Sequence, residues 1–226
     1  MFKNISKLAI IFIFGAGGGI FASQILWPQS DVSVPVIETK EITIEENTAL
    51  QDAIEKIRKS IVAIKTETKE GKTITGSGLA VTNDGLVVTL SEIVPKKGNF
   101  VFFVDGQTPN WQILKRDEEN NLALIKVEQS NLSTVAFVDF DQVRLGQRVF
   151  LLGIIFEKNG RLEAVNEGIV SSLSSDRIKT NIIEKSALSG SALFNIKGEL
   201  LGLNVIDSEG KVTAIPVTKI RAFLGR

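Results

Sequence analysis

The stretch from residue 76 to residue 94, GSGLAVTNDGLVVTLSEIV, holds two runs of strand-forming residues around a turn. The runs are GSGLAV (76–81) and LVVTL (86–90), which are rich in the aliphatic and β-branched side chains that favour strands. Between them lies Asn-Asp-Gly at 83–85, a typical turn sequence. The pattern predicts two short strands joined by a turn.

The same pattern recurs along the rest of the chain, from Ser60 onward. Turn signals such as Asp105-Gly106 and Asn159-Gly160 separate many of the runs. About eleven short strands without long helices between them favour an antiparallel barrel or sandwich over a parallel sheet. The other predicted strands are SIVAIKTET (60–68), FVFFV (100–104), WQILK (111–115), LALIKV (122–127), RVFLLG (148–153), GIVSSL (168–173), ALFNI (192–196), LLGLNVI (200–206) and VTAIPV (212–217).

Short helices are predicted at both ends of this strand-rich region. Thr48 and Gln51 match a capping box, and apolar residues follow them at helical spacing. The run TKIRAFL, Thr218 to Leu224, predicts a brief closing helix. We therefore expect one domain to extend over residues 48–226.

The amino-terminal segment from Leu8 to Leu26 carries no charged residue. As a helix it would be about 28 Å long, close to the thickness of the hydrocarbon core of a bilayer. Lys3 and Lys7 precede it, and Trp27 follows at an interfacial position. The segment predicts a single-pass transmembrane anchor at 8–27 in the cell membrane.

The positive charges place residues 1–7 in the cytoplasm and the rest of the chain outside it. Residues 28–47 contain Pro28 and Pro35 and show no helical period, so we expect an extracytoplasmic linker there. The alternative for the apolar segment is a signal peptide cleaved after Ala22.

The composition excludes several functional classes. The chain has 26 basic and 26 acidic residues, and the basic ones form no stripe that would follow a nucleic-acid backbone. It contains no cysteine and no histidine, so thiolate chemistry, disulfides and the commonest zinc ligands are excluded. We expect no metal, no cofactor and no nucleic-acid partner.

A candidate nucleophile lies in KSALSGSALFN (185–195). Ser189 is followed by glycine in a turn of small residues, just before a short apolar strand. A serine hydroxyl needs a neighbouring base, and the chain has no imidazole to act as one. Lys185, Glu184 and Glu163 are the other side chains that we considered for this role.

Four stretches resemble, in order and spacing, the trypsin-like domain of the HtrA (Deg) serine proteases. The resemblance implies an all-β fold of two antiparallel six-stranded β-barrels with an active-site cleft between them. It also leads us to expect that the PDZ domains common in this family are missing. The four stretches are GSGLAVTNDGLVVTLSEIV (76–94), DEENNLALIKV (117–127), SALSGSALFNIKGELLGLN (186–204) and AIPVTKIRAFL (214–224).

By this resemblance, the chain departs from the family at the catalytic positions. Glu92 occupies the position of the catalytic histidine and Asn121 that of the aspartate, so only Ser189 of the triad is retained. The oxyanion hole would use the backbone N–H groups of Ala187 and Ser189, and Ala187 replaces a family glycine.

These replacements predict a silent site. A glutamate has a reference pKa of about 4.3 and is a poor proton acceptor from an alcohol at neutral pH. A carboxylate at Glu92 would also have no charged partner at Asn121. Replacing the triad aspartate alone by asparagine costs about 10⁴ in turnover in serine proteases.

We therefore expect a membrane-anchored, catalytically inactive domain that acts as a peptide-binding or regulatory module for extended peptides or envelope and membrane proteins. By resemblance, its peptide-binding edge comprises Leu201, Gly202, Leu203, Asn204, Val205 and Ile206. The alternatives are an active serine endopeptidase with a rearranged Ser189 site, and a structural component whose cleft is filled by its own loops. The oligomeric state stays open.

Overall fold

The computed structural model describes residues 46–225. The segments predicted as cytoplasmic end and anchor, residues 1–27, and most of the predicted linker lie outside the described residues. Among the helices of 46–225, none combines the length and the apolar character needed to cross a bilayer. The membrane anchor therefore stays a prediction from the sequence.

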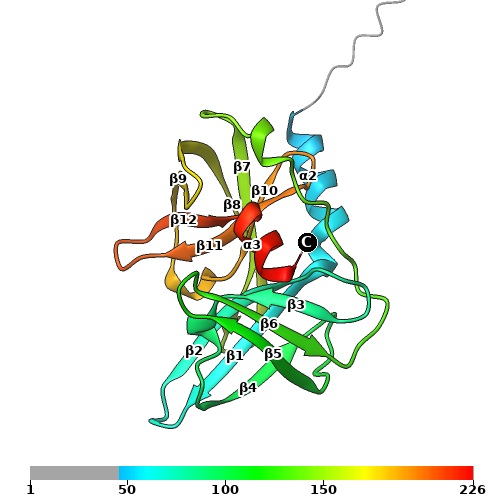
Figure 1. The fold of residues 1–226 in the computed structure, drawn as a ribbon. Coiled ribbons are helices and arrows are strands. Elements are labelled where there is room, and N and C mark those ends of the chain that lie inside the picture. Colours follow the sequence, from blue (N-terminus) through cyan, green and yellow to red (C-terminus); the bar gives the residue numbers. More distant parts are fainter. Residues whose placement is uncertain (1–45, 226) are drawn as a thin grey trace, which may run out of the picture. The chain divides into compact units, whose positions relative to one another are not determined.

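The first sheet contains six antiparallel strands in the order β4-β1-β2-β3-β6-β5 (Figure 1). Hydrogen bonds do not join its two edge strands, β4 and β5, so the sheet is an open barrel. The strands are β1 (Ile61–Thr68), β2 (Thr73–Ala80), β3 (Leu86–Thr89), β4 (Gly98–Phe103), β5 (Trp111–Asp117) and β6 (Leu122–Val127).

Aromatic side chains bridge the gap between β4 and β5. The ring of Trp111 packs against those of Phe100 and Phe102, with centroids 5.2 and 5.4 Å apart. Side-chain packing thus takes the place of a backbone ladder at this point. The first of the two predicted six-stranded barrels is therefore a half-barrel.

The second sheet is a closed barrel of six strands in the order β10-β11-β12-β9-β8-β7. The all-β fold with two six-stranded sheets is thereby confirmed, and this second barrel is closed as expected. The strands are β7 (Arg148–Glu157), β8 (Gly160–Leu173), β9 (Ile178–Ile183), β10 (Ala192–Asn195), β11 (Leu200–Ile206) and β12 (Lys211–Pro216).

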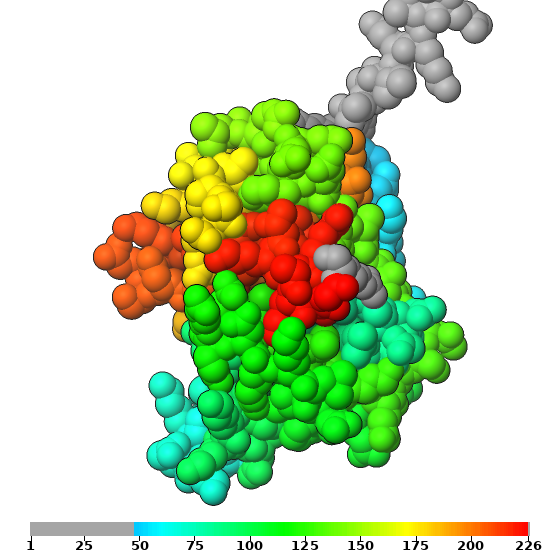
Figure 2. All heavy atoms as spheres, viewed as in Figure 1, coloured from blue at the N-terminus to red at the C-terminus, as the bar shows by residue number. Residues whose placement is uncertain are grey.

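Two α-helices flank the sheets within the described residues. The helix α2 (Glu46–Ile57) begins two residues before the expected Thr48 and buries Ala53 and Ile57 beside Gly198. The closing helix α3 (Val217–Leu224) contacts β11 and β12 of the barrel and β6 of the first sheet. Figure 2 shows α3, in red, between the green first sheet and the yellow β8 and β9 region.

A single turn of 3₁₀ helix, η1 (Arg58–Ser60), joins α2 to β1. Three more such turns lie between strands: η2 (Ser91–Ile93), η3 (Phe140–Gln142) and η4 (Ser186–Leu188). The predicted turn at 83–85 is also present, and Gly85 has a φ of 103°. A Cβ on Gly85 would lie against the carbonyl oxygen of Val127, so the turn needs glycine there.

The predicted strands omitted β9 and shortened the hairpin of β7 and β8. In β9, buried Ile178 and Ile182 alternate with exposed polar residues, which is the ordinary pattern of a half-buried strand. The outer part of β8 carries charged residues such as Arg161, Glu163 and Glu167, which are untypical of strands. Continuous pairing with β7 from Glu157↔Gly160 onward compensates for that composition.

Candidate active site

A cleft of about 420 Å³ lies where η2 of the first sheet meets η4 of the barrel. It brings together four residues singled out from the sequence, Ser189, Glu92, Ala187 and Ile206. The other residues that line the cleft were not predicted from the sequence, because no local sequence signal distinguishes them from ordinary strand and turn residues. These are Lys72, Thr73, Ile74, Thr75, Ile93 and Ser186.

The backbone around Ser189 is held from both sheets. The carbonyl oxygen of Ser189 accepts a hydrogen bond from the N–H of Ser77 in β2, at 3.0 Å. The N–H of Gly190 donates to the carbonyl of Asn204 in β11, at 2.8 Å. Gly190 has a φ of 77°, and a Cβ there would lie against the carbonyl oxygen of Ser77. The serine is therefore fixed at the junction of the two sheets.

The oxyanion-hole position is occupied by an internal hydrogen bond. The N–H of Ser189 donates to the carbonyl of Ser186 at 2.9 Å, which closes the 3₁₀ turn η4. An oxyanion hole needs this N–H directed at the substrate oxygen. In this conformation one of the two expected donors, Ser189, is already used within the protein, whereas Ala187 lines the cleft.

Asn121 holds the turn that carries Glu92. Its side-chain Oδ1 accepts from the Ser91 hydroxyl at 2.9 Å and from the Glu92 N–H at 3.1 Å. Its carbonyl oxygen accepts from the Ser91 N–H at 3.2 Å. A carboxylate at this position could accept the same two side-chain bonds. Asn121 therefore supports this turn without a charge.

The Ser189 hydroxyl makes no hydrogen bond to a titratable side chain of residues 48–225. Glu92 lines the same cleft, but it is exposed to solvent. Of the other candidate bases, Glu184 accepts from the side-chain amide of Asn166 at 2.8 Å. Glu163 forms an ion pair with Arg58 at 3.4 Å, and neither glutamate lines the cleft beside Ser189.

Lys185, the remaining candidate base, is exposed. It lines a second hollow of about 550 Å³ with Glu184, Ser186 and Asp207. Leu188 is 2% exposed and packs in the core beside Gly153. It does not line the cleft, so the cleft is not filled by this side chain.

Residues 201–206, predicted from the sequence as a peptide-binding edge, lie in β11, which is paired over most of its length. Strand β11 pairs with β12 on one side, and its first part pairs with β10 on the other. Both the N–H and the carbonyl of Asn204 are engaged on that second side, by Ser191 and Gly190. Leu201, Gly202, Leu203 and Asn204 are thus flanked on both sides.

Only the end of β11 is open. Backbone groups of an antiparallel strand point alternately to its two sides. Asn204 bonds away from β12, whereas Asp207 donates to Lys211 on the β12 side. Ile206 therefore directs its N–H and carbonyl away from β12, beyond the end of β10 and at the cleft that it lines.

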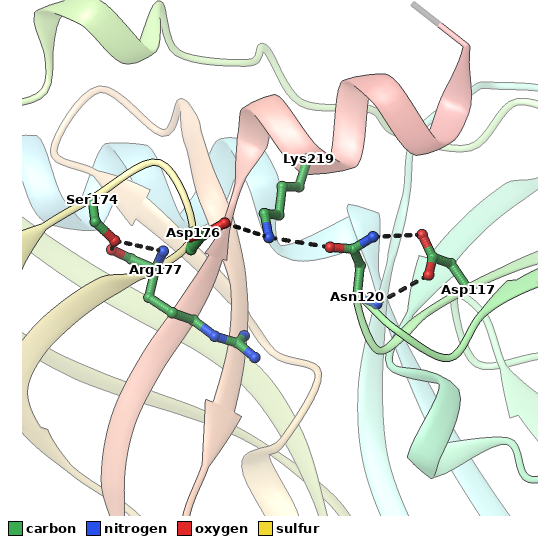
Figure 3. Close-up of polar contacts among 6 residues, drawn as sticks. All are labelled: Asp117, Asn120, Ser174, Asp176, Arg177 and Lys219. Carbon is green, nitrogen blue, oxygen red and sulfur yellow. Dashed lines mark hydrogen bonds and ion pairs between the residues drawn. The ribbon is translucent and has the colours of Figure 1, made fainter.

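A polar network connects α3 to the turn before Asn121 (Figure 3). Lys219 pairs with Asp176 at 2.7 Å and donates to the side-chain oxygen of Asn120 at 3.1 Å. Asn120 in turn donates to Asp117 through its backbone and its side chain. The network ties the barrel to the β5–β6 turn, which sets the position of Asn121.

Both carboxylates of this network have lowered pKa values. Hydrogen bonds from the backbone and then the side chain of Asn120 lower the pKa of Asp117. A hydrogen bond from Lys219, followed by its charge, lowers the pKa of Asp176. Both groups therefore favour the folded state when they are ionised.

Comparison with known proteins supports the assignment of this fold. The profile of the trypsin-like peptidase domain family matches residues 76–203, more than half of the chain. The chain therefore belongs to the trypsin-like peptidase domain family. This finding confirms that the domain is trypsin-like, as the resemblance seen in the sequence implied.

The relatives are HtrA-type proteins. A probable periplasmic serine protease do/HhoA-like of Haemophilus influenzae is 32% identical over 111 residues, covering 44% of this chain and 23% of the relative. Serine protease HTRA1 of Xenopus tropicalis is 31% identical over 134 residues, covering 53% and 28%. The matched region thus spans less than a third of the length of either relative.

A solved structure titled HtrA-type protease AlgW with tripeptide superposes with a TM-score of 0.69. Its sequence is 21% identical, and the match covers 78% of this chain and 62% of that one. At this identity the likeness shows the shared fold alone.

We expect Asn121→Ala to destabilise the protein by about 1–3 kcal/mol, because two donors lose their acceptor. Asn121→Asp should stay within about 0.5 kcal/mol of the wild type, since a carboxylate accepts the same bonds. Urea unfolding of the full chain measures both. Asn131→Ala is the matched control, because Asn131 also has positive φ. Equal losses for Asn121→Asp and Asn121→Ala would contradict this role.

The network predicts a specific acid sensitivity. Asp117 has a folded-state pKa below its unfolded value of about 3.9, so its contribution is present above about pH 4 and is lost as the pH falls through the folded pKa. The stability difference between wild type and Asp117→Asn should therefore shrink below about pH 4. Thermal unfolding from pH 7 down to pH 2.5 measures it, and a constant difference would refute the prediction.

Proposed function

We propose that this chain is a proteolytically silent trypsin-like domain that binds an extended peptide segment in the cleft beside Ser189. The observation that carries the proposal is the state of Ser189 itself. Its N–H is bonded to Ser186, and its hydroxyl has no hydrogen bond to a titratable side chain of the described residues.

The lack of proteolytic activity follows from the chemistry of acyl transfer. The serine must lose a proton as it attacks, and the same base must return that proton to the leaving amine. Glu92 is an exposed carboxylate in the cleft. The side-chain oxygen of Asn121 accepts a hydrogen bond from the Glu92 N–H. Loss of a single oxyanion-hole donor costs a further factor of about 10²–10³.

Peptide binding is supported by the open end of β11. Ile206 presents a free pair of backbone groups to the cleft, and an extended peptide can pair with such an edge as an added strand. On the opposite wall, β2 and the preceding turn contribute Lys72, Thr73 and Thr75. The cleft can therefore contact a peptide from both sheets without any chemical step.

The placement of this site in the cell is also a proposal. A membrane anchor at residues 8–27 would hold the cleft near the outer surface of the membrane, where it would meet envelope proteins and exposed segments of membrane proteins. Tethering raises the effective concentration of such partners. This part rests on the sequence alone.

The reactivity of Ser189 directly tests whether the domain lacks proteolytic activity. We expect no labelling of the full-length protein by a fluorophosphonate probe and no cleavage of casein, because the hydroxyl is not activated. Ser189→Ala should behave like the wild type in both assays. Labelling or cleavage that disappears in Ser189→Ala would overturn the proposal in favour of an endopeptidase with a rearranged site.

Binding is tested with fluorescein-labelled β-casein, an extended polypeptide, by fluorescence anisotropy. We expect saturable binding without cleavage. Ala187→Trp places a large ring in the cleft and should weaken binding at least about tenfold, a cost of about 1.4 kcal/mol. Ala136→Trp, the same change at an exposed site that does not line the cleft, should have no effect. Equal affinity for the two variants would place binding elsewhere.

A further inference from the structure

Another pocket, of about 280 Å³, is distinct from the hollow at Lys185 and shares no residue with the cleft beside Ser189. It is formed by the start of β1, the end of β4 and its turn, and the outer part of the β7–β8 hairpin. We call it the Arg161 pocket and define it by Lys59, Ile61, Phe103, Asp105, Ile154 and Arg161.

The pocket contains two cations that have no carboxylate partner. Lys59 and Arg161 form no ion pair with any residue of 48–225. The third cation at the pocket, Arg58, is instead paired with Glu55 at 3.1 Å and with Glu163 at 3.4 Å. The positive charge open to a ligand is therefore that of Lys59 and Arg161.

Arg161 contacts an aromatic ring at the pocket. Its guanidinium lies 4.2 Å from the centre of the Phe103 ring, and Phe103 packs in turn on Phe156 at 5.5 Å. A stacked guanidinium keeps its N–H groups at its edge, where they can donate to a carboxylate in pairs. Preorganisation of this kind reduces the ordering cost of binding.

The remaining lining limits the type of anion. Ile61 is buried, and Ile154 and Phe103 are half-buried, so they provide an apolar wall. Asp105 has a φ of 45° and makes no ion pair within residues 48–225, which leaves a hydrogen-bond acceptor in the pocket. Inorganic anions would gain nothing from the apolar wall.

We propose that the Arg161 pocket binds an N-acylated aliphatic amino acid through its α-carboxylate. Arg161 and Lys59 receive the carboxylate, Ile61 and Ile154 contact the aliphatic side chain, and Asp105 accepts the amide N–H. This chemistry occurs in a free N-acylated amino acid and in the last residue of a peptide. The site is independent of the proposed function of the cleft.

The probe is N-acetyl-L-leucine, titrated into the isotope-labelled full-length protein and followed by NMR. We expect saturable shifts of the Gly106 and Phe103 amides, which belong to the pocket. N-acetyl-L-leucinamide lacks the carboxylate and should bind at least about tenfold more weakly, equal to about 1.4 kcal/mol. A hexapeptide ending in leucine distinguishes a peptide terminus from a free N-acylated amino acid as the ligand. Tighter binding of the hexapeptide than of N-acetyl-L-leucine indicates a peptide terminus, and equal binding indicates a free amino acid.

Arg161→Gln should reduce the affinity at least about tenfold, with an unchanged unfolding temperature showing that the fold is retained. If this variant is destabilised, Lys59→Gln makes the same test from another element. Lys158→Gln is the matched control, since Lys158 lies in the same hairpin and does not line the pocket. Absence of saturable shifts, or equal binding of acid and amide, would overturn the proposal.

Discussion

A single buried serine, Ser77 in β2, joins the two sheets of this protein. Its N–H donates to the carbonyl of Ser189, and its hydroxyl oxygen accepts from the N–H of Ile154 in β7 at 2.9 Å. Its own carbonyl accepts from the hydroxyl of Thr89 at 2.7 Å. Because Ser77 is fully buried, each of these groups would be costly to leave unpaired. This junction holds β2 against β7 and the Ser189 turn, and the cleft lies beside it.

The interactions that shape the site are separate from those that a protease would use for chemistry. The Ser189 turn is held by backbone bonds to Ser77 and Asn204, and Glu92 takes part in neither bond. Asn121 still supports the Glu92 turn, because an amide oxygen accepts hydrogen bonds as a carboxylate does. The bonds that shape this cleft therefore do not require a base beside the serine.

Much of the fold could be predicted from the sequence, because strand composition and turn glycines are local signals. LALIKV (122–127) and LLGLNVI (200–206) match the bounds of β6 and β11. The outer part of β8 could not be found in this way, since its pairing with β7 outweighs its charged composition. The packing of Trp111 on Phe100, which bridges the gap between β4 and β5, could not be predicted from the sequence either, because it depends on how the two strands come together in the fold.

For the site, the sequence alone determined which chemical groups exist: a serine in a small-residue turn, the carboxylate of Glu92, the amide of Asn121, and no imidazole anywhere. Only the tertiary structure decided how those groups are used. It turned the Ser189 N–H onto Ser186, and it left Ile206 as the open end of β11. The physical reason is that the direction of a hydrogen bond and the exposure of a strand edge depend on which segments pack together, and no local pattern in the chain encodes that.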